Sequence, residues 1–117
     1  SKKIIEDCIY ALDKYDAVCT TINSTDTIFE ISDNVIARIP ERNLLMRAQT
    51  PQGFKLSVIK NAHELAKNDK TFTDDCGLVV KYNLADVYIV DGSTSNIKVT
   101  FPEDLFLMQK YIEDNSL

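Results

Sequence analysis

A helical pattern that passes directly into a strand pattern constrains the fold of this chain more than any other feature of its sequence. Within residues 2–14, the apolar side chains that recur at helical spacing are Ile4, Ile5, Cys8, Ile9 and Leu12. Ser1 stands at the expected N-cap position, and residues 16–23 follow with β-branched residues that favour strands. A helix that leads into a strand is typical of α/β proteins, so we predict an α/β domain with Cys8 in its core.

The composition indicates one domain and excludes several classes of partner. The chain has 117 residues, of which 44% are hydrophobic, enough for a modest core. It has no apolar run near the roughly 20 residues of a membrane helix, so we expect no membrane partner. A net charge of −5 argues against nucleic acid as the main partner. The three cysteines, Cys8, Cys19 and Cys76, are widely spaced, which predicts free thiols in a reducing cytoplasm and neither a disulfide nor a zinc site.

A basic stretch interrupts this acidic chain between residues 38 and 60. It contains five cations (Arg38, Arg42, Arg47, Lys55 and Lys60) and one anion (Glu41), a local balance of +4. Such a stretch suits a small anionic ligand such as a phosphate, and a solvated basic face is the alternative. Residues 49–52 add hydroxyl and amide groups beside a proline-fixed bend, which favours the ligand site. We expect residues 44–49 to form a strand that ends at this bend.

Two short strand patterns precede the basic stretch. They cover residues 26–31 and 35–39, and the turn residues Ser-Asp-Asn separate them, which predicts a β-hairpin. Its strands mix polar and apolar residues, so the hairpin need not cover the core of its own domain. An ordinary surface hairpin is one interpretation and a protruding arm is the other.

A second helix is expected near residues 56–66, followed by a third that starts at residues 73–75. His63 lies in the former and is interpreted as structural, because no other histidine or cysteine stands at ligand spacing. Thr73 is expected to cap the third helix, where free N–H groups also suit a phosphate. The neighbouring Asp74 and Asp75 point about 100° apart on a helix, so we predict no catalytic or metal-binding dyad there.

The last third of the chain predicts two strands and a final helix. Residues 86–90 form the first strand pattern, and residues 96–101 alternate in polarity with Lys98 on the polar side. Thr100 and Glu103 have the spacing of a capping box, so an ordinary helix is expected over about residues 103–113. Lys98 then stands at a sheet edge beside a helix N-terminus, where two sources of positive potential suit a phosphoryl group.

Four sequence motifs together resemble the cytidylyltransferases that act on small polyol phosphates, a family that includes methylerythritol-phosphate and ribitol-phosphate enzymes. The strongest combines Arg-Asn at residues 42–43 with Ala-Gln-Thr-Pro-Gln-Gly-Phe at residues 48–54. The others are Asp-Thr-Ile at 26–28, Thr-Asp-Asp at 73–75, and Asn-Ile-Lys-Val-Thr at 96–100 followed by Pro-Glu-Asp-Leu at 102–105. Each motif alone is weak, but four in the expected order over most of the chain make a strong match.

This resemblance implies an enzyme that transfers CMP from CTP to a polyol phosphate and releases pyrophosphate, with Mg²⁺ as cofactor. It implies that Arg42 binds the substrate phosphate from its own or the neighbouring subunit, and that Thr50 contacts the polyol. It further implies that Thr73 binds the substrate phosphate and that Lys98 is catalytic, stabilising charge between the two phosphates. No metal ligand is assigned within the chain. Phe29 stands where many methylerythritol-type members have lysine, which leaves the choice of polyol phosphate open.

The resemblance also implies a doubly wound, Rossmann-like nucleotidyltransferase sheet with a protruding β-hairpin arm. Residues 1–117 correspond to its C-terminal part, and an arm near residues 24–42 is expected to make a homodimer. The glycine-rich nucleotide-binding half of the family has no counterpart here, so the chain alone is expected to be inactive. Whether a split protein, proteolysis or an isolated fragment explains this stays open. A non-catalytic dimerisation or interaction module is the alternative function.

Overall fold

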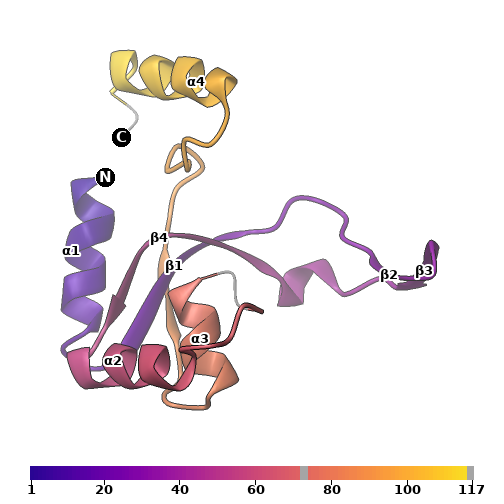
Figure 1. Cartoon of the computed structure of the whole chain (residues 1–117). Coiled ribbons are helices and arrows are strands. Elements are labelled where there is room, and N and C mark those ends of the chain that lie inside the picture. Colours follow the sequence, from indigo (N-terminus) through magenta and orange to yellow (C-terminus); the bar gives the residue numbers. More distant parts are fainter. Residues whose placement is uncertain (72–73, 116–117) are drawn as a thin grey trace.

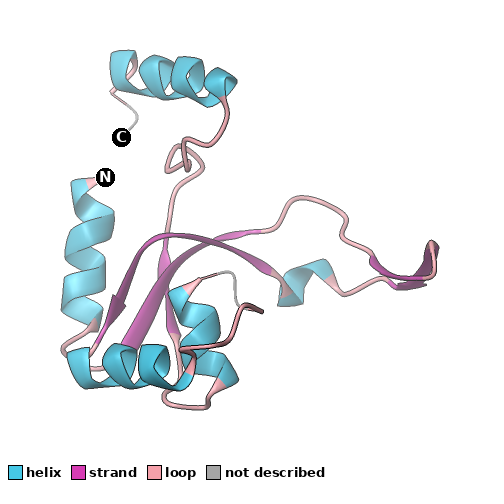
Figure 2. Cartoon of the chain, in the orientation of Figure 1, coloured by secondary structure: helices cyan, strands magenta, loops and turns pink. Residues whose placement is uncertain are grey.

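The central strand of the main sheet is β1 (Ala17–Asn23), which pairs on both of its sides. It runs antiparallel to β4 (Met46–Phe54) and parallel to β5 (Tyr88–Asp91). The computed structural model describes residues 1–71 and 74–115. Figures 1 and 2 show helices around this mixed sheet, so the prediction of an α/β domain is confirmed.

The first helix, α1 (Lys2–Ala11), forms as its pattern predicted. The Ser1 side chain accepts a hydrogen bond from the backbone N–H of Ile4 at 3.4 Å, so the expected cap is confirmed. The helix buries Ile4 and Cys8 against Val18 and Val90 of the sheet. Cys8 therefore belongs to the core, as predicted.

The other face of the sheet is covered by α2 (Leu56–Leu65) and α3 (Asp75–Lys81). The buried residues of this second cluster are Ala17, Ala62, Ala66, Leu78 and Val79. Ala17 and Val18 are neighbours in β1 and must point to opposite faces, because side chains alternate along a strand. The sheet is therefore packed between helices on both faces.

A separate two-stranded sheet forms the hairpin β2 (Glu30–Ser32) and β3 (Val35–Arg38), which confirms the predicted hairpin with a shorter first strand. Asp33 and Asn34 join the strands with φ values of 50° and 65°. Positive φ at both central residues is the requirement of a tight hairpin turn, and Asp and Asn tolerate it. Figure 1 shows the hairpin far from the main sheet.

The expectation that the strand after residue 44 ends at the proline bend is wrong. A short 3-10 helix (Arg42–Leu44) precedes β4, which continues through Thr50 and Pro51 to Phe54. Its pairing with β1 shifts register between Cys19 and Thr21, and the Thr50–Pro51 peptide bond is cis. Proline lacks an N–H, so it is tolerated in a strand where the ladder is interrupted. Pro51 still accepts a hydrogen bond at 2.6 Å from the Thr20 hydroxyl.

The expectation of a strand over residues 96–101 is also wrong. Strand β5 ends at Asp91, and the chain then turns, with the N–H of Asn96 donating to the carbonyl of Ser93 at 3.0 Å. Figure 2 shows the segment between β5 and the last helix as a loop. Alternating polarity here did not produce a strand, because the described segment has no pairing partner.

The last helix, α4 (Pro102–Glu113), confirms the helix that was expected over about residues 103–113. It buries none of its residues, and Phe106 is 77% exposed. Asp104, and not Glu103, caps it by accepting hydrogen bonds from the N–H groups of Thr100 and Phe101. Figure 1 shows α4 standing away from the sheet. In the part of the chain that the structure describes, every helix is too short or too polar to span a bilayer.

Candidate functional site

Thr50 and Lys98 line one pocket of about 500 Å³. The lining residues come from β1, β4, the residue before α3, the loop after β5, and α4. The lining residues are Ile22, Arg47, Ala48, Gln49, Thr50, Gln52, Asp74, Thr94, Asn96, Ile97, Lys98, Asp104, Leu107 and Tyr111. Two of the four residues selected from the sequence are thus brought together, although residues 50 and 98 lie far apart in the chain.

An amide network joins the two walls that carry these residues. The Gln49 side chain donates to the carbonyl of Ser93 at 2.9 Å and accepts from its N–H at 3.3 Å. The Asn96 amide donates to the Gln49 side chain at 3.3 Å and to the carbonyl of Thr50 at 2.6 Å. Strand β4 and the loop before Lys98 are therefore directly bonded to each other.

A second amide ties β4 to the start of α3. Gln52 donates to the Asp74 carboxylate at 3.0 Å and accepts from the N–H of Cys76 at 3.2 Å. The N-cap of α3 is Asp74, which accepts from the N–H of Gly77 at 2.7 Å, so the expectation that Thr73 caps this helix is wrong. Thr73 itself lies outside the described residues.

The charges around the pocket leave its cations available for a ligand. Asp104 is held by two backbone N–H groups, which lower the pKa of its carboxyl group. Asp74 is engaged by Gln52 and the start of α3. Over residues 1–71 and 74–115, Arg47 and Lys98 form no ion pair. An anion entering the pocket would meet two cations that are not held in ion pairs, although Asp74 and Asp104 also line the pocket.

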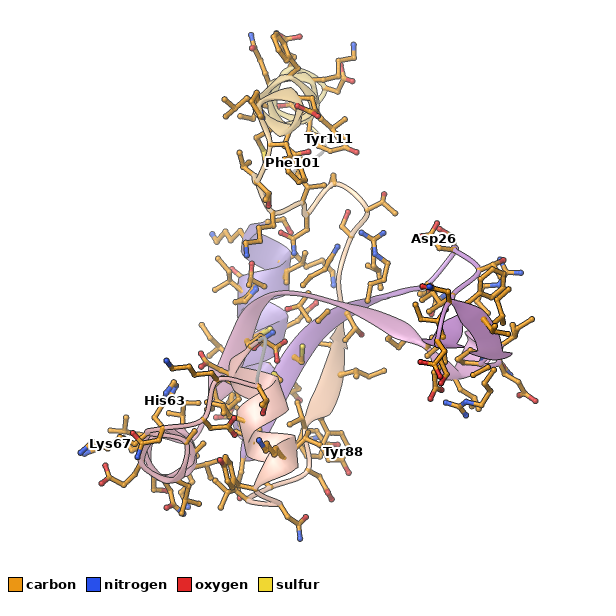
Figure 3. The ribbon with its side chains drawn as sticks, turned by 45° about the vertical axis from the view of Figure 1, so that its right-hand side comes forward. Asp26, His63, Lys67, Tyr88, Phe101 and Tyr111 are labelled. Carbon is orange, nitrogen blue, oxygen red and sulfur yellow. The ribbon has the colours of Figure 1, made fainter. Side chains whose placement is uncertain are left out.

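Arg42 is not among the residues that line this pocket. It is exposed at the base of the hairpin and donates to the carbonyl of Thr25 at 3.0 Å. Figure 3 shows the neighbouring Asp26 on the hairpin side, away from Phe101 and Tyr111 near α4. Within one chain, the structure therefore separates Arg42 from Thr50 and Lys98.

The basic stretch does not form the single cationic site that its charge suggested. Arg38 pairs with Glu30 on the hairpin at 2.8 Å. Lys55 is the N-cap of α2, and Lys60 lies on the exposed side of that helix. Of the five cations, only Arg47 lines the pocket, because the strand, the hairpin and the helix carry the others in different directions.

The single histidine and the three cysteines lie outside the pocket lining. His63 contacts Asp75 at 2.9 Å and joins α2 to α3 at the surface, in keeping with its structural interpretation. Cys8, Cys19 and Cys76 are free, as predicted, and all three are buried. A hydrogen bond between the Cys19 and Cys76 thiols lowers the pKa of Cys19 and raises that of Cys76. Among the described residues, no group of three His, Cys, Asp or Glu side chains is placed to hold a metal ion.

Asp69 anchors the loop between α2 and α3. Its carboxylate pairs with Lys81, accepts from the hydroxyl and N–H of Thr71 at 2.6 and 2.8 Å, and accepts from the Tyr82 hydroxyl at 2.8 Å. The Lys81 bond, followed by those of Thr71 and Tyr82, holds the pKa of Asp69 well below its usual range.

We expect Asp69→Asn to lower the melting temperature at pH 7, with a deficit that shrinks as the pH falls below about 4. A carboxyl group whose pKa is lower in the folded than in the unfolded state stabilises the fold above its unfolded pKa. That contribution is lost as the pH falls through the folded value. The measurement is thermal unfolding from pH 2 to pH 7.

The matched control is Glu6→Gln, which removes an exposed pair with Lys2 at 3.8 Å. Exposed pairs of this kind contribute little, so this variant should melt like the parent protein at every pH. A pH-independent deficit in Asp69→Asn would show that the charge of Asp69 is not what stabilises the loop.

Comparisons with known proteins agree with the sequence motifs. Residues 1–114 match the model of the IspD family, 2-C-methyl-D-erythritol 4-phosphate cytidylyltransferase. The chain is 42% identical over 113 residues to the protein of that name from Thermobifida fusca, covering 90% of this chain and 45% of the relative. It is 40% identical over 118 residues to the bifunctional ribulose 5-phosphate reductase/CDP-ribitol pyrophosphorylase Bcs1 of Haemophilus influenzae, covering 97% of this chain and 25% of the relative.

Solved structures give the same match. The 4-diphosphocytidyl-2C-methyl-D-erythritol synthase of Anaerococcus prevotii superposes with a TM-score of 0.87 at 32% identity, over 97% of this chain and 53% of that one. The 2-C-methyl-D-erythritol 4-phosphate cytidylyltransferase of Thermus thermophilus gives 0.80 at 25% identity, over 97% and 56%. The chain thus spans about half the length of most of the relatives that it matches.

Proposed function

The chain belongs to the IspD family, 2-C-methyl-D-erythritol 4-phosphate cytidylyltransferase, and we propose that it acts as the C-terminal part of an enzyme that transfers CMP from CTP to a polyol phosphate. The observation that carries this proposal is the meeting of Thr50 and Lys98 in one pocket, where Lys98 and Arg47 form no ion pair within the described residues. The relatives' names support methylerythritol 4-phosphate or ribitol 5-phosphate as the acceptor. The complete enzyme would comprise this chain and the nucleotide-binding half that the resemblance implies, in one doubly wound, Rossmann-like sheet.

In the proposed reaction, a phosphate oxygen of the polyol phosphate attacks the α-phosphorus of CTP in line. The new P–O bond forms as the bond to the β-phosphate breaks, and pyrophosphate leaves. Catalysis of this type depends on positioning and on neutralising charge. Lys98 would stabilise the charge between the two phosphates, and Thr50 would contact the polyol.

Arg42 and Thr73 would bind the phosphate of the acceptor. Because Arg42 lies at the base of the hairpin and outside the pocket of its own chain, we propose that it serves the site of a neighbouring subunit. The N–H groups of Cys76 and Gly77 at the start of α3 already donate to Gln52 and Asp74, so they would not assist Thr73. The cytoplasm, where the three free thiols would stay reduced, is the proposed location.

Mg²⁺ is the cofactor that the family resemblance implies, and it would neutralise charge on the triphosphate. Mg²⁺ is usually held by one or two carboxylates together with substrate phosphates. The two carboxylates that line the pocket, Asp74 and Asp104, already accept hydrogen bonds from helix starts. We therefore assign no magnesium ligand to this chain and propose that the ligands lie outside it.

Pyrophosphate release by the complete enzyme tests the function. CTP is supplied with methylerythritol 4-phosphate in one assay and with ribitol 5-phosphate in another, and Mg²⁺ is present in both. We expect release with one acceptor and formation of the matching CDP-polyol, detected by mass spectrometry. No release with either acceptor would contradict the proposal and would favour the non-catalytic interaction module.

We also expect the complete enzyme to be a homodimer that depends on the hairpin. The hairpin exposes apolar side chains that its own sheet cannot cover, among them Ile31 at 67% and Val35 at 66%. Replacement of residues 26–40 by a short Gly-Ser link should convert the dimer to a monomer, because that apolar surface is lost. Light scattering coupled to size-exclusion chromatography measures the change.

The control for this experiment is Leu65→Asp, which alters an exposed apolar residue of α2 outside the hairpin. It should leave the dimer intact. If the protein without the hairpin remains a dimer, the contact between subunits lies elsewhere.

A further inference from the structure

The side chain of Gln49 binds both backbone groups of Ser93. Its amide nitrogen donates to the Ser93 carbonyl at 2.9 Å, and its amide oxygen accepts from the Ser93 N–H at 3.3 Å. The Gln49 amide thus satisfies the Ser93 N–H and C=O groups, which a neighbouring strand would otherwise bond through its backbone. This contact fixes the first residues of the loop after β5 to strand β4.

Asn96 fixes the same loop at a second point, two residues before Lys98. Its side-chain amide donates to the Thr50 carbonyl at 2.6 Å and to the Gln49 side chain at 3.3 Å. The Asn96 N–H closes a turn onto the Ser93 carbonyl at 3.0 Å. Ser93 and Asn96 are thus both held by strand β4, at Thr50 and the residue before it.

Gly92 provides the space in which the Gln49 side chain lies. A Cβ at Gly92 would come within 2.1 Å of the Gln49 side-chain oxygen and 3.1 Å of the Thr21 carbonyl. The N–H of Gly92 also bonds that carbonyl, at 2.8 Å. Because Thr21, Gly92 and the Gln49 side chain are packed this closely, the loop has little room to adopt another conformation.

We propose that Gln49 and Asn96 are positioning residues that hold the loop bearing Lys98 at a set place relative to Thr50. The inference rests on the proposed function and extends it to residues that need not touch substrate. Lys98 is exposed and has no ion pair within the described residues, so no ion pair fixes its side chain. A misplacement of about 1 Å in a positioned group can cost about 100-fold in rate.

Amide hydrogen exchange on the complete enzyme tests whether the loop is held in this way. Gln49→Leu removes all three side-chain hydrogen bonds at nearly constant volume. Amide exchange at Ser93, Asn96 and Ile97 should then become about tenfold faster or more. A tenfold change is what the loss of one hydrogen bond of typical net free energy produces. Gln52→Leu is the matched control: it makes the same replacement on the same strand but breaks contacts to α3. Its loop amides should exchange as in the parent. Unchanged exchange in Gln49→Leu would overturn the inference.

A double-mutant cycle tests whether the loop matters through Lys98. Gln49→Leu should lower kcat by about 10-fold to 100-fold, with a smaller change in KM for the polyol phosphate. In a Lys98→Ala background the same replacement should cost almost nothing further, because the group that it positions is gone. If the fold-losses in kcat of the two single variants multiply in the double variant, Gln49 acts independently of Lys98 and the inference is overturned.

The two levels of the proposal fail differently. If the parent enzyme releases no pyrophosphate, the proposed function is wrong. The hydrogen-exchange experiment still decides whether Gln49 restricts the motion of the loop. If the parent is active and Lys98→Ala keeps its turnover, positioning of Lys98 has no catalytic consequence and the inference is wrong. A general loss of folding would appear as a lower melting temperature in Gln49→Leu and as faster exchange across the sheet.

Discussion

Lys98→Ala is expected to lower kcat of the complete enzyme by on the order of 10²–10³, which is the cost of losing one preorganised donor in other enzymes. The ammonium group of Lys98 would meet phosphoryl oxygens whose charge redistributes as pyrophosphate leaves. An interaction that strengthens in the transition state lowers the barrier, whereas one that is equal in both states changes only binding. Steady-state kinetics with saturating CTP and polyol phosphate measures the loss.

Arg42→Ala is the comparison that gives this result its meaning. The phosphate that Arg42 is proposed to bind carries its charge before and after the reaction, so its loss should mainly raise KM. Thermal melting of both variants shows whether the fold is retained. A folded Lys98→Ala enzyme with near-normal turnover would make Lys98 a surface residue of the loop and would remove it from the proposed mechanism.

Leu78→Ala is expected to lower the free energy of unfolding by about 2–5 kcal/mol. Leu78 is fully buried between the sheet and α2, in the cluster with Ala17, Ala62 and Val79. Truncation removes apolar contacts and leaves a cavity that surrounding strands and helices cannot fill completely. Such a loss is a large part of the total stability of about 5–15 kcal/mol for a typical domain. Urea denaturation of the complete enzyme measures it.

Val80→Ala is the control on the same helix, because Val80 is 62% exposed. Its cost should stay within about 0.5 kcal/mol, as for most surface substitutions. Equal losses for the two variants would mean that the apolar face of α3 is not oriented as the structure has it.

Local sequence patterns were sufficient to predict several elements of this fold. The spacing of Ile4 and Cys8 predicted α1 and its buried face, and Ser1 predicted its cap. The turn residues Ser-Asp-Asn between two strand patterns predicted the hairpin, and Asp33 and Asn34 adopt the positive φ that its turn requires. These predictions succeeded because each depends on interactions within a few residues of the chain.

The candidate site was only partly predictable. Thr50 and Lys98 were selected by resemblance to a family, and the structure brings them into one pocket. The roles of Gln49 and Asn96 were not recognised, although both stand inside the motifs that carry the resemblance. Neither the spacing nor the charge of an amide side chain in a sequence indicates which distant group it will hydrogen-bond. Tyr111 of α4 also lines the pocket, and no local signal pointed to it.

The sequence by itself determined where most helices and the hairpin form, which face α1 buries, and the family to which the chain belongs. Only the tertiary structure decided that β4 continues past Pro51, because β1 supplies a partner on the far side of the register shift. It also decided that residues 96–101 form a loop, since no strand pairs with them in the described structure and Gln49 bonds to Ser93 across 44 residues of chain. Local energies favour an element, but contacts between distant residues select among the elements that a segment can form.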